Sequence, residues 1–197
     1  MYEIILASGS PRRREILSEL NLPFQVIPSD AEEVIEANCP PYLTVERLSL
    51  LKAADVAKTQ NKNALVIGAD TVVVLDGEIL TKPENAQDAK RMLSLLSNRE
   101  HSVLTGISVV RCSDGKAVSV YEETKVCFGP ISEEEIDRYV ASGEPLDKAG
   151  AYGIQGLGSL FTQKIDGDYF NVVGLPVFRL AKLLKEEFDY NIMLEVC

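Results

Sequence analysis

Apolar runs alternate with helical periodicity along the first half of the chain. Three short apolar runs, Glu3–Ala7, Phe24–Ile27 and Ala64–Ile67, predict strands. Between them, apolar positions spaced three or four residues apart predict helices over Pro11–Leu20 and Thr44–Lys58. An alternating order of strands and helices is typical of an α/β fold.

Turn signals dominate the middle and later parts of the chain. Three pairs of apolar runs are each separated by a turn that contains Asp-Gly, a strong hairpin signal. The predicted hairpins join Val72–Leu75 to Glu78–Leu80, Val103–Arg111 to Lys116–Phe128, and Leu160–Ile165 to Tyr169–Val173. Hairpins beside strand–helix units predict a mixed β-sheet with flanking helices.

Capping residues predict where the remaining helices begin. Asn85 precedes an amphipathic stretch, and Ser132 followed by Glu135 forms a capping box that opens a helix to about Ala141. Pro176 suits the start of the last long helix, and Tyr190–Leu194 predicts a terminal strand. No linker, repeat or low-complexity segment interrupts the chain, so we expect residues 1–197 to form one domain.

Charge and composition exclude several classes of protein. The net charge of −10 counts against a general nucleic-acid binder, although a local basic pocket remains compatible with it. There is no apolar stretch of about 18 residues, and the start lacks the basic region of a signal peptide, so we expect no membrane span and no leader. The four cysteines show no metal-ligand spacing, which favours reduced thiols in a cytoplasmic protein.

The histidine content limits the catalytic chemistry. His101, the only histidine, lies in the polar segment Asn98–Ser102, which predicts a surface loop. A Ser–His–Asp triad or a multi-histidine metal site is therefore improbable. If the protein is an enzyme, we expect its base to be a carboxylate or a lysine.

A concentration of positive charge follows the first predicted strand. The segment Ser8–Arg14 reads SGSPRRR, a tight turn leading into a helix with three arginines in its first turn. Cations at a helix N-terminus oppose the helix dipole, and a bound polyanion would remove that conflict. The segment therefore predicts a phosphate cradle; the alternative is a solvated basic turn paired with nearby glutamates.

Four other side chains are candidates for chemistry, each with a plain structural alternative. Asp70 follows a buried strand and could bind Mg²⁺ or accept a proton from water, or only cap a turn. Lys82 and Lys52 could each reach a phosphate, or extend along the surface. Glu33, together with Glu32 beside it, could bind metal, or belong to a solvated acidic loop.

The glycine-rich segment Gly150–Gly158 allows close approach of the backbone to a ligand. Gln155 within it carries both a donor and an acceptor, which suits recognition of the edge of a nucleobase. The alternative is a turn-rich loop without a ligand.

Six segments, taken in order, resemble the motif series of the Maf family of nucleotide pyrophosphatases. They are SGSPRRREIL, GADTVV, EILTKP, LTGISV, GEPLDKAGAYGIQGLG and GDYFNVVGLP. The resemblance implies the fold of the inosine-triphosphate pyrophosphatases, with a mixed sheet and two lobes around a central cleft. It also implies a cytoplasmic, often dimeric enzyme that hydrolyses nucleoside triphosphates to monophosphate and pyrophosphate with a divalent cation, Mg²⁺ or Mn²⁺.

The resemblance assigns roles residue by residue. Asp70 matches the proposed acceptor of the proton from the attacking water. The positions that match phosphate or metal contacts in the family are Ser8, Arg13, Glu33, Lys52 and Lys82. Leu50-Leu51 departs from the charged pair that many members carry before the lysine at position 52, which predicts different packing around Lys52.

Arg12, Thr71 and Gln155 match the positions associated with base preference. Their pattern resembles the branch that acts on dTTP and UTP, whereas the 7-methyl-GTP branch typically carries Trp, Gln and Glu there. The alternatives to a dTTP/UTP pyrophosphatase are the same chemistry on 7-methyl-GTP or another purine nucleotide, and a non-catalytic regulator of septum formation.

Overall fold

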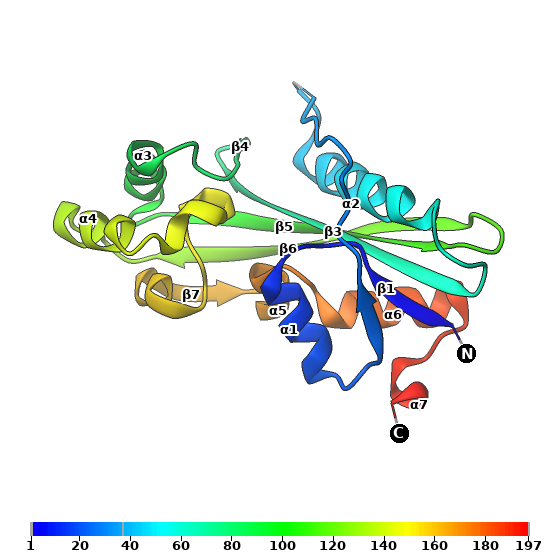
Figure 1. Ribbon diagram of the computed structural model, residues 1–197. Helices are drawn as coiled ribbons and strands as arrows, with labels where there is room; N and C mark the ends of the chain where they lie inside the picture. Colours follow the sequence, from blue (N-terminus) through cyan, green and yellow to red (C-terminus); the bar gives the residue numbers. More distant parts are fainter. Residues whose placement is uncertain (1, 37, 197) are drawn as a thin grey trace. The chain divides into compact units, whose positions relative to one another are not determined.

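The computed structural model describes residues 2–36 and 38–196, which divide into two compact units. Of the described residues, the first unit comprises 2–36, 38–70, 105–122 and 174–196, and the second comprises 71–104 and 123–173. Three long strands, β3 (Ala64–Leu75), β5 (Glu100–Arg111) and β6 (Ala117–Phe128), contribute residues to both units (Figure 1).

The strands form one mixed sheet, as the alternating and hairpin patterns predicted. The shorter strands are β1 (Glu3–Leu6), β2 (Phe24–Val26), β4 (Glu78–Leu80) and β7 (Thr162–Asp166). Their order in the sheet is β2-β1-β3-β5-β6-β7, with β4 paired to β3. Strand β1 is parallel to β2 and β3, whereas β4 and β7 run antiparallel to β3 and β6.

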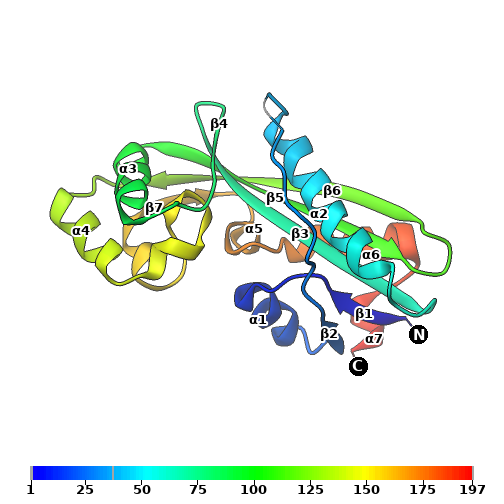
Figure 2. The same ribbon diagram turned by 45° about the horizontal axis from the view of Figure 1, so that its top comes forward.

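In the first unit, helices lie on both faces of the sheet (Figures 1 and 2). These helices are α1 (Pro11–Glu19), α2 (Pro41–Ala57), α6 (Val177–Phe188) and α7 (Ile192–Glu195). Helix α2 approaches β3 and β5 closely at two glycines. A Cβ on Gly68 would lie 2.1 Å from the carbonyl oxygen of Ser49, and one on Gly106 would lie 2.2 Å from that of Val45. Only glycine permits this approach of α2 to the sheet.

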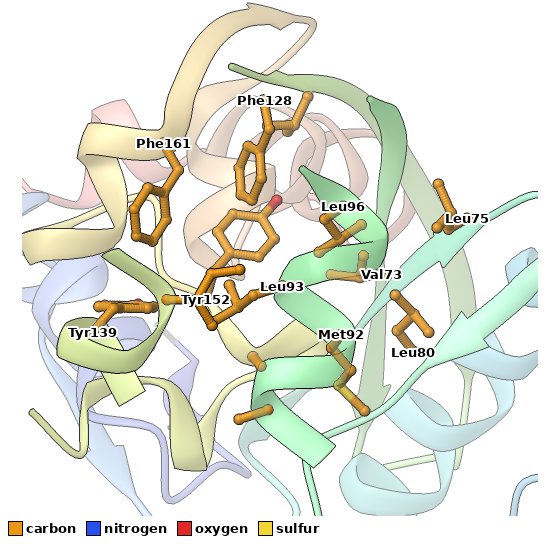
Figure 3. Close-up of a cluster of buried hydrophobic side chains, with 14 of the residues drawn as sticks. Val73, Leu75, Leu80, Met92, Leu93, Leu96, Phe128, Tyr139, Tyr152 and Phe161 are labelled. Atoms are coloured by element: carbon orange, nitrogen blue, oxygen red, sulfur yellow. The ribbon is translucent and has the colours of Figure 1, made fainter. Parts of the chain in front are cut away.

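The second unit has its own apolar core (Figure 3). Its helices are α3 (Ala86–Leu96), α4 (Glu133–Ala141), α5 (Tyr169–Val173) and the 3-10 segments η1 (Glu144–Asp147), η2 (Ala149–Ala151) and η3 (Gly156–Phe161). Met92, Leu93 and Leu96 of α3 are buried in this core. The rings of Phe128 and Tyr152 meet edge to face there, with centroids 4.7 Å apart.

Two of the capping predictions and the tight turn at Asp76-Gly77 are confirmed, whereas α2 begins at Pro41, ahead of the predicted cap Thr44. The Asn85 side chain accepts a hydrogen bond from the Asp88 N–H, and Ser132 and Glu135 form a complete capping box. Asp76 and Gly77 have φ angles of +52° and +86°, as a type I′ hairpin requires.

Two predicted strands are wrong. Tyr169–Val173 forms α5, because Asp168 Oδ1 accepts the Phe170 N–H and the Asn171 side chain donates to the Val103 carbonyl and Thr124 Oγ1. The predicted terminal strand contains a helical turn instead, α7, in which Asn191 Oδ1 accepts the Met193 N–H. In both places a polar side chain accepts a backbone N–H that a strand would use in a ladder.

Two further expectations are corrected. The segment Gly68–Thr71 lies inside β3 and does not end a strand. Gly68 does not form a turn there; its missing side chain leaves room for the backbone of α2. His101 lies in β5 and is only 3% exposed, so the prediction of a surface loop is wrong. Its Nε2 is 2.7 Å from the Tyr152 hydroxyl, and its ring packs edge to face on Phe128. Within residues 2–36 and 38–196, no helix combines the length and the apolar character that crossing a bilayer requires.

Candidate active site

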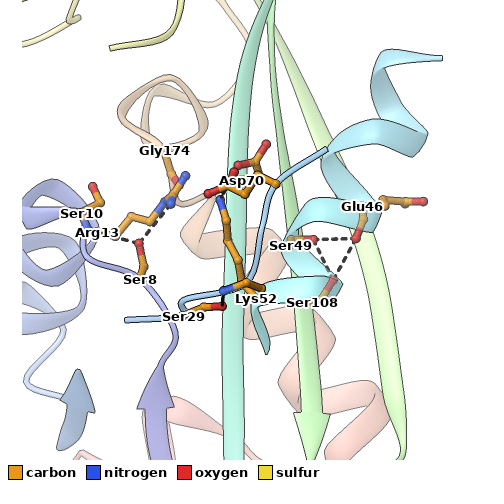
Figure 4. A network of polar contacts seen from close by, with 12 residues as sticks. Ser8, Ser10, Arg13, Ser29, Glu46, Ser49, Lys52, Asp70, Ser108 and Gly174 are labelled. Atoms are coloured by element: carbon orange, nitrogen blue, oxygen red, sulfur yellow. Dashed lines mark hydrogen bonds and ion pairs between the residues drawn. The ribbon is translucent and has the colours of Figure 1, made fainter. Parts of the chain in front are cut away.

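The start of α1 and the end of β1 form the first half of the site, in the first unit (Figure 4). Ser8 follows β1 and is 6% exposed. Its Oγ accepts hydrogen bonds from the Ser10 N–H at 3.2 Å and from Arg13 Nη1 at 3.1 Å. Arg13 Nε donates to the Gly174 carbonyl at 2.8 Å, which orients the guanidinium from a second side. The first turn of α1 holds no acidic residue, so its dipole and arginines present positive charge together.

A lysine and two carboxylates form the second half. Lys52 Nζ of α2 lies 2.6 Å from Asp70 Oδ1 of β3 and 2.8 Å from Glu33 Oε2. The side chains of Lys52 and Asp70 are 12% and 11% exposed, whereas that of Glu33 is 48% exposed. One ammonium group therefore holds an inner and an outer carboxylate close together. Lys52 is not a snorkelling surface lysine, and Asp70 does not cap a turn.

The close packing of α2 on β3 explains this geometry. Gly68 and Asp70 are two residues apart on one strand, so both face α2. The Cβ that Gly68 lacks would lie 2.9 Å from the Ala53 backbone nitrogen, next to Lys52 in the chain. Without a glycine at 68, α2 could not bring Lys52 to Asp70.

Opposing electrostatic effects act on Asp70. Burial raises the pKa of the Asp70 carboxyl above its ordinary value, and the charges of Lys52 and then Arg13 act against that rise. Burial likewise lowers the pKa of Arg13, which the charge of Asp70 opposes. Asp70 is thus a carboxylate more basic than one in water, kept near two cations.

The loop that carries Glu33 is attached to α2 by a hydroxyl. Ser29 Oγ donates to Asp55 Oδ2 at 2.8 Å and accepts the Ala31 N–H at 3.1 Å. The hydrogen bond from Ser29 to Asp55 is the main cause that lowers the pKa of the Asp55 carboxyl. Ser29 therefore fixes the start of the acidic loop on the helix that also carries Lys52.

The nine predicted site residues divide between the two units. Ser8, Arg13, Glu33, Lys52 and Asp70 belong to the first unit, as does Arg12, whose charge acts on Arg13. The remaining predicted residues are Thr71, Lys82 and Gln155, all in the second unit. Their use together with Asp70 stays a prediction, and so does the central cleft.

Two contributors escaped the sequence reasoning. One is the carbonyl of Gly174, which lies 161 positions from Arg13. Gly174 belongs to the segment GDYFNVVGLP, and its place in that motif is the only feature of the sequence that could have pointed to it. Ser29 precedes the acidic loop directly, and nothing in the sequence indicates its bond to Asp55.

The donor set of the two carboxylates fits a divalent cation. Asp70 and Glu33 offer hard oxygen ligands that converge on Lys52. In the described part of the chain there is no group of three or more His, Cys, Asp or Glu side chains placed to hold a metal. Mg²⁺ is commonly held by one or two carboxylates together with substrate phosphates, and the donor types of this pair fit such an ion.

Positive groups at a helix N-terminus beside a buried carboxylate are typical of enzymes that act on phosphate esters and anhydrides. The sequence profile of the family described as "Maf-like protein" matches residues 3–187, which include residues of both units. The chain belongs to this family.

Curated relatives align over almost the whole chain. A dTTP/UTP pyrophosphatase of Bacillus mycoides (strain KBAB4) is 52% identical over 192 residues, which cover 98% of each protein. A dTTP/UTP pyrophosphatase of Bacillus cytotoxicus is 52% identical over 189 residues, 96% of this chain and 97% of that one. Among solved structures, the Staphylococcus aureus Ham1 protein aligns with 64% of this chain and 71% of its own, at a TM-score of 0.48 and 20% identity.

Proposed function

We propose that this protein is a nucleoside triphosphate pyrophosphatase that hydrolyses dTTP and UTP to the monophosphate and pyrophosphate. The observation that carries the proposal is the contact of Lys52 with both Asp70 and Glu33, beside Arg13 at the start of α1. The names of the Bacillus relatives support the choice of substrate.

In this proposal Asp70 accepts the proton of the attacking water. A base is more effective when its pKa approaches the working pH, and burial raises the pKa of Asp70 in that direction. Lys52 and Arg13 keep the carboxylate ionised, because both favour its charged form. Lys52 then stabilises negative charge that develops on the phosphate chain.

Ser8, Arg12, Arg13, Lys52 and Lys82 would bind the triphosphate. Hydrolysis breaks the anhydride bond between the α and β phosphates, and pyrophosphate leaves with its negative charge. Arg13 is held on two sides, by Ser8 and Gly174, so its guanidinium is oriented before substrate binds. Preorganised cations of this kind stabilise the transition state without reorganisation.

Glu33 and Asp70 would hold Mg²⁺ or Mn²⁺. Such an ion neutralises phosphate charge when it is bound together with the nucleotide. Arg12, Thr71 and Gln155 would select the base. The amide of Gln155 can pair with the adjacent carbonyl and N–H of a uracil or thymine edge.

The proposal also covers the setting of the enzyme. Residues 1–197 would work as one catalytic domain, in a cytoplasmic homodimer that acts on free nucleotides and binds no membrane. The net charge of −10 supports the exclusion of nucleic acid as a partner.

The test is pyrophosphate release from dTTP, UTP, CTP, 7-methyl-GTP, GTP and ITP with Mg²⁺ or Mn²⁺. The native protein is compared with Asp70→Asn and with Asp137→Asn, a control at an exposed aspartate of α4. We expect selective turnover of dTTP and UTP that only Asp70→Asn abolishes. Turnover of 7-methyl-GTP or a purine nucleotide instead would reassign the substrate. No turnover of any nucleotide would favour the regulator.

A further inference from the structure

A half-buried carboxylate and a tyrosine hydroxyl hold the loop that carries Gln155, within the second unit. Glu144 Oε1 accepts the Gly158 N–H at 3.2 Å, and its Oε2 accepts the Leu157 N–H at 3.1 Å. The Tyr139 hydroxyl of α4 donates to Glu144 Oε1 at 3.0 Å and accepts the Gly153 N–H at 3.2 Å. We call this arrangement the Glu144–Tyr139 clamp.

The clamp holds backbone groups on both sides of Gln155. Gly153 precedes Gln155 by two residues, and Leu157 and Gly158 follow it by two and three. Gln155 itself is exposed, and no hydrogen bond of the clamp uses its side chain. The clamp therefore fixes the backbone around Gln155 and leaves its amide available to a ligand.

Steric contacts in the same place leave little freedom. Gly156 has a φ of +69°, and a Cβ on it would lie 2.9 Å from Glu144 Oε2. A Cβ on Gly158 would lie 2.4 Å from the Gly153 carbonyl oxygen and 2.6 Å from the Tyr139 hydroxyl. The glycines of this segment thus allow the backbone to approach the side chains of the clamp closely.

The protonation state of Tyr139 suits this role. Burial raises the pKa of Tyr139, so its hydroxyl stays protonated and donates to the carboxylate. A carboxylate that accepts backbone N–H groups forms charge-assisted hydrogen bonds, which are stronger than neutral ones.

We propose that Glu144 and Tyr139 are positioning residues that set base selectivity by holding the loop of Gln155. This inference rests on the proposed function, since it assigns base recognition to Gln155. Because a mispositioned amide loses its discrimination between nucleobases, loosening the clamp reduces selectivity more than it reduces turnover.

The test compares Glu144→Gln and Tyr139→Phe with the native protein. A matched control is Glu135→Gln, which weakens a carboxylate–backbone contact at the other end of α4 and leaves the clamp intact. The readouts are kcat and KM for UTP and CTP, and the hydrogen-exchange rates of the Gly153, Leu157 and Gly158 amides. We expect both clamp variants to lower the ratio of kcat/KM for UTP to that for CTP by about tenfold, through KM for UTP. The same variants accelerate exchange of those amides, and Glu135→Gln does neither.

The outcomes separate the two proposals. If the native protein prefers UTP and both clamp variants keep its ratio, the clamp inference is overturned and the proposed function stands. If exchange at the three amides is unchanged in both variants, the clamp inference is also overturned. If the native protein does not hydrolyse UTP, or does not prefer it, the proposed function fails and the assignment to base selectivity fails with it.

Discussion

Gly68 of β3 lies directly beneath the carbonyl of Ser49 in α2, so closely that a Cβ would come within 2.1 Å of that oxygen. This contact determines how near α2 can lie to β3, and with it the distance from Lys52 to Asp70. The backbone atoms of a helix cannot move aside as a flexible side chain can. A residue without a side chain thus contributes to the geometry of charged groups beside it.

Gly68→Ala should therefore lower both stability and turnover. The added methyl group must displace α2, and we expect a loss of about 2–3 kcal/mol in the free energy of unfolding, measured by urea denaturation. Gly129→Ala is the matched control, because a Cβ there meets nothing within 4 Å. We expect that control to change stability by less than about 1 kcal/mol. Equal effects of the two substitutions would contradict the steric explanation.

Lys52→Met should move the pH dependence of turnover. The charge of Lys52 opposes the rise in the pKa of Asp70 that burial causes, so removing it raises that pKa further. The acidic limb of the kcat profile, where Asp70 becomes protonated, then shifts to higher pH. At neutral pH we also expect kcat to fall by about 10²-fold.

The control for this substitution is Lys58→Met, at a lysine that is 73% exposed at the end of the same helix. It should leave the profile of kcat against pH unchanged. A profile of Lys52→Met that scales down without shifting would show that Lys52 does not set the pKa of Asp70.

Glu33→Gln should weaken the response to the divalent cation. The substitution keeps the size of the side chain and removes one of the two carboxylates that contact Lys52. We expect the Mg²⁺ concentration for half-maximal turnover to rise about tenfold. Glu32→Gln, at the adjacent exposed glutamate, is the control. If both variants need the same Mg²⁺ as the native protein, Glu33 is not a metal ligand.

His101 should make the protein less stable in acid. Burial lowers its pKa from 6.5 to about 4, so between these values the unfolded chain binds a proton that the folded protein does not. The stabilisation is complete above pH 6.5 and is lost as the pH falls to about 4, where the loss reaches about 3 kcal/mol.

Urea denaturation at pH 7 and pH 4.5 measures this effect. His101→Gln removes the titrating group and should lose less stability than the native protein over the same interval. A Gln variant that shows the native pH dependence would assign the acid sensitivity to other groups.

Three predictions that depended on local chemistry were accurate. Asn85, Ser132 and the Asp76-Gly77 turn act on backbone groups within three residues, so their effect can be read without knowledge of the fold. The prediction from local propensity was wrong at Tyr169–Val173, where residues that favour strands form the helix α5. There the Asn171 side chain bonds to residues 47 and 68 positions away, and those contacts outweigh the local propensity.

The sequence by itself determined the mixed α/β architecture, the turn and arginines of SGSPRRR, and the residue types of the proposed chemistry. Only the tertiary structure decided that Lys52 joins Asp70 to Glu33, that Gly174 orients Arg13, and that Glu144 with Tyr139 holds the loop of Gln155. These contacts join separate elements of the chain, and in one case they span 161 positions. The pattern of a single segment encodes its own periodicity and caps, whereas a contact between segments depends on the packing of all the elements between them.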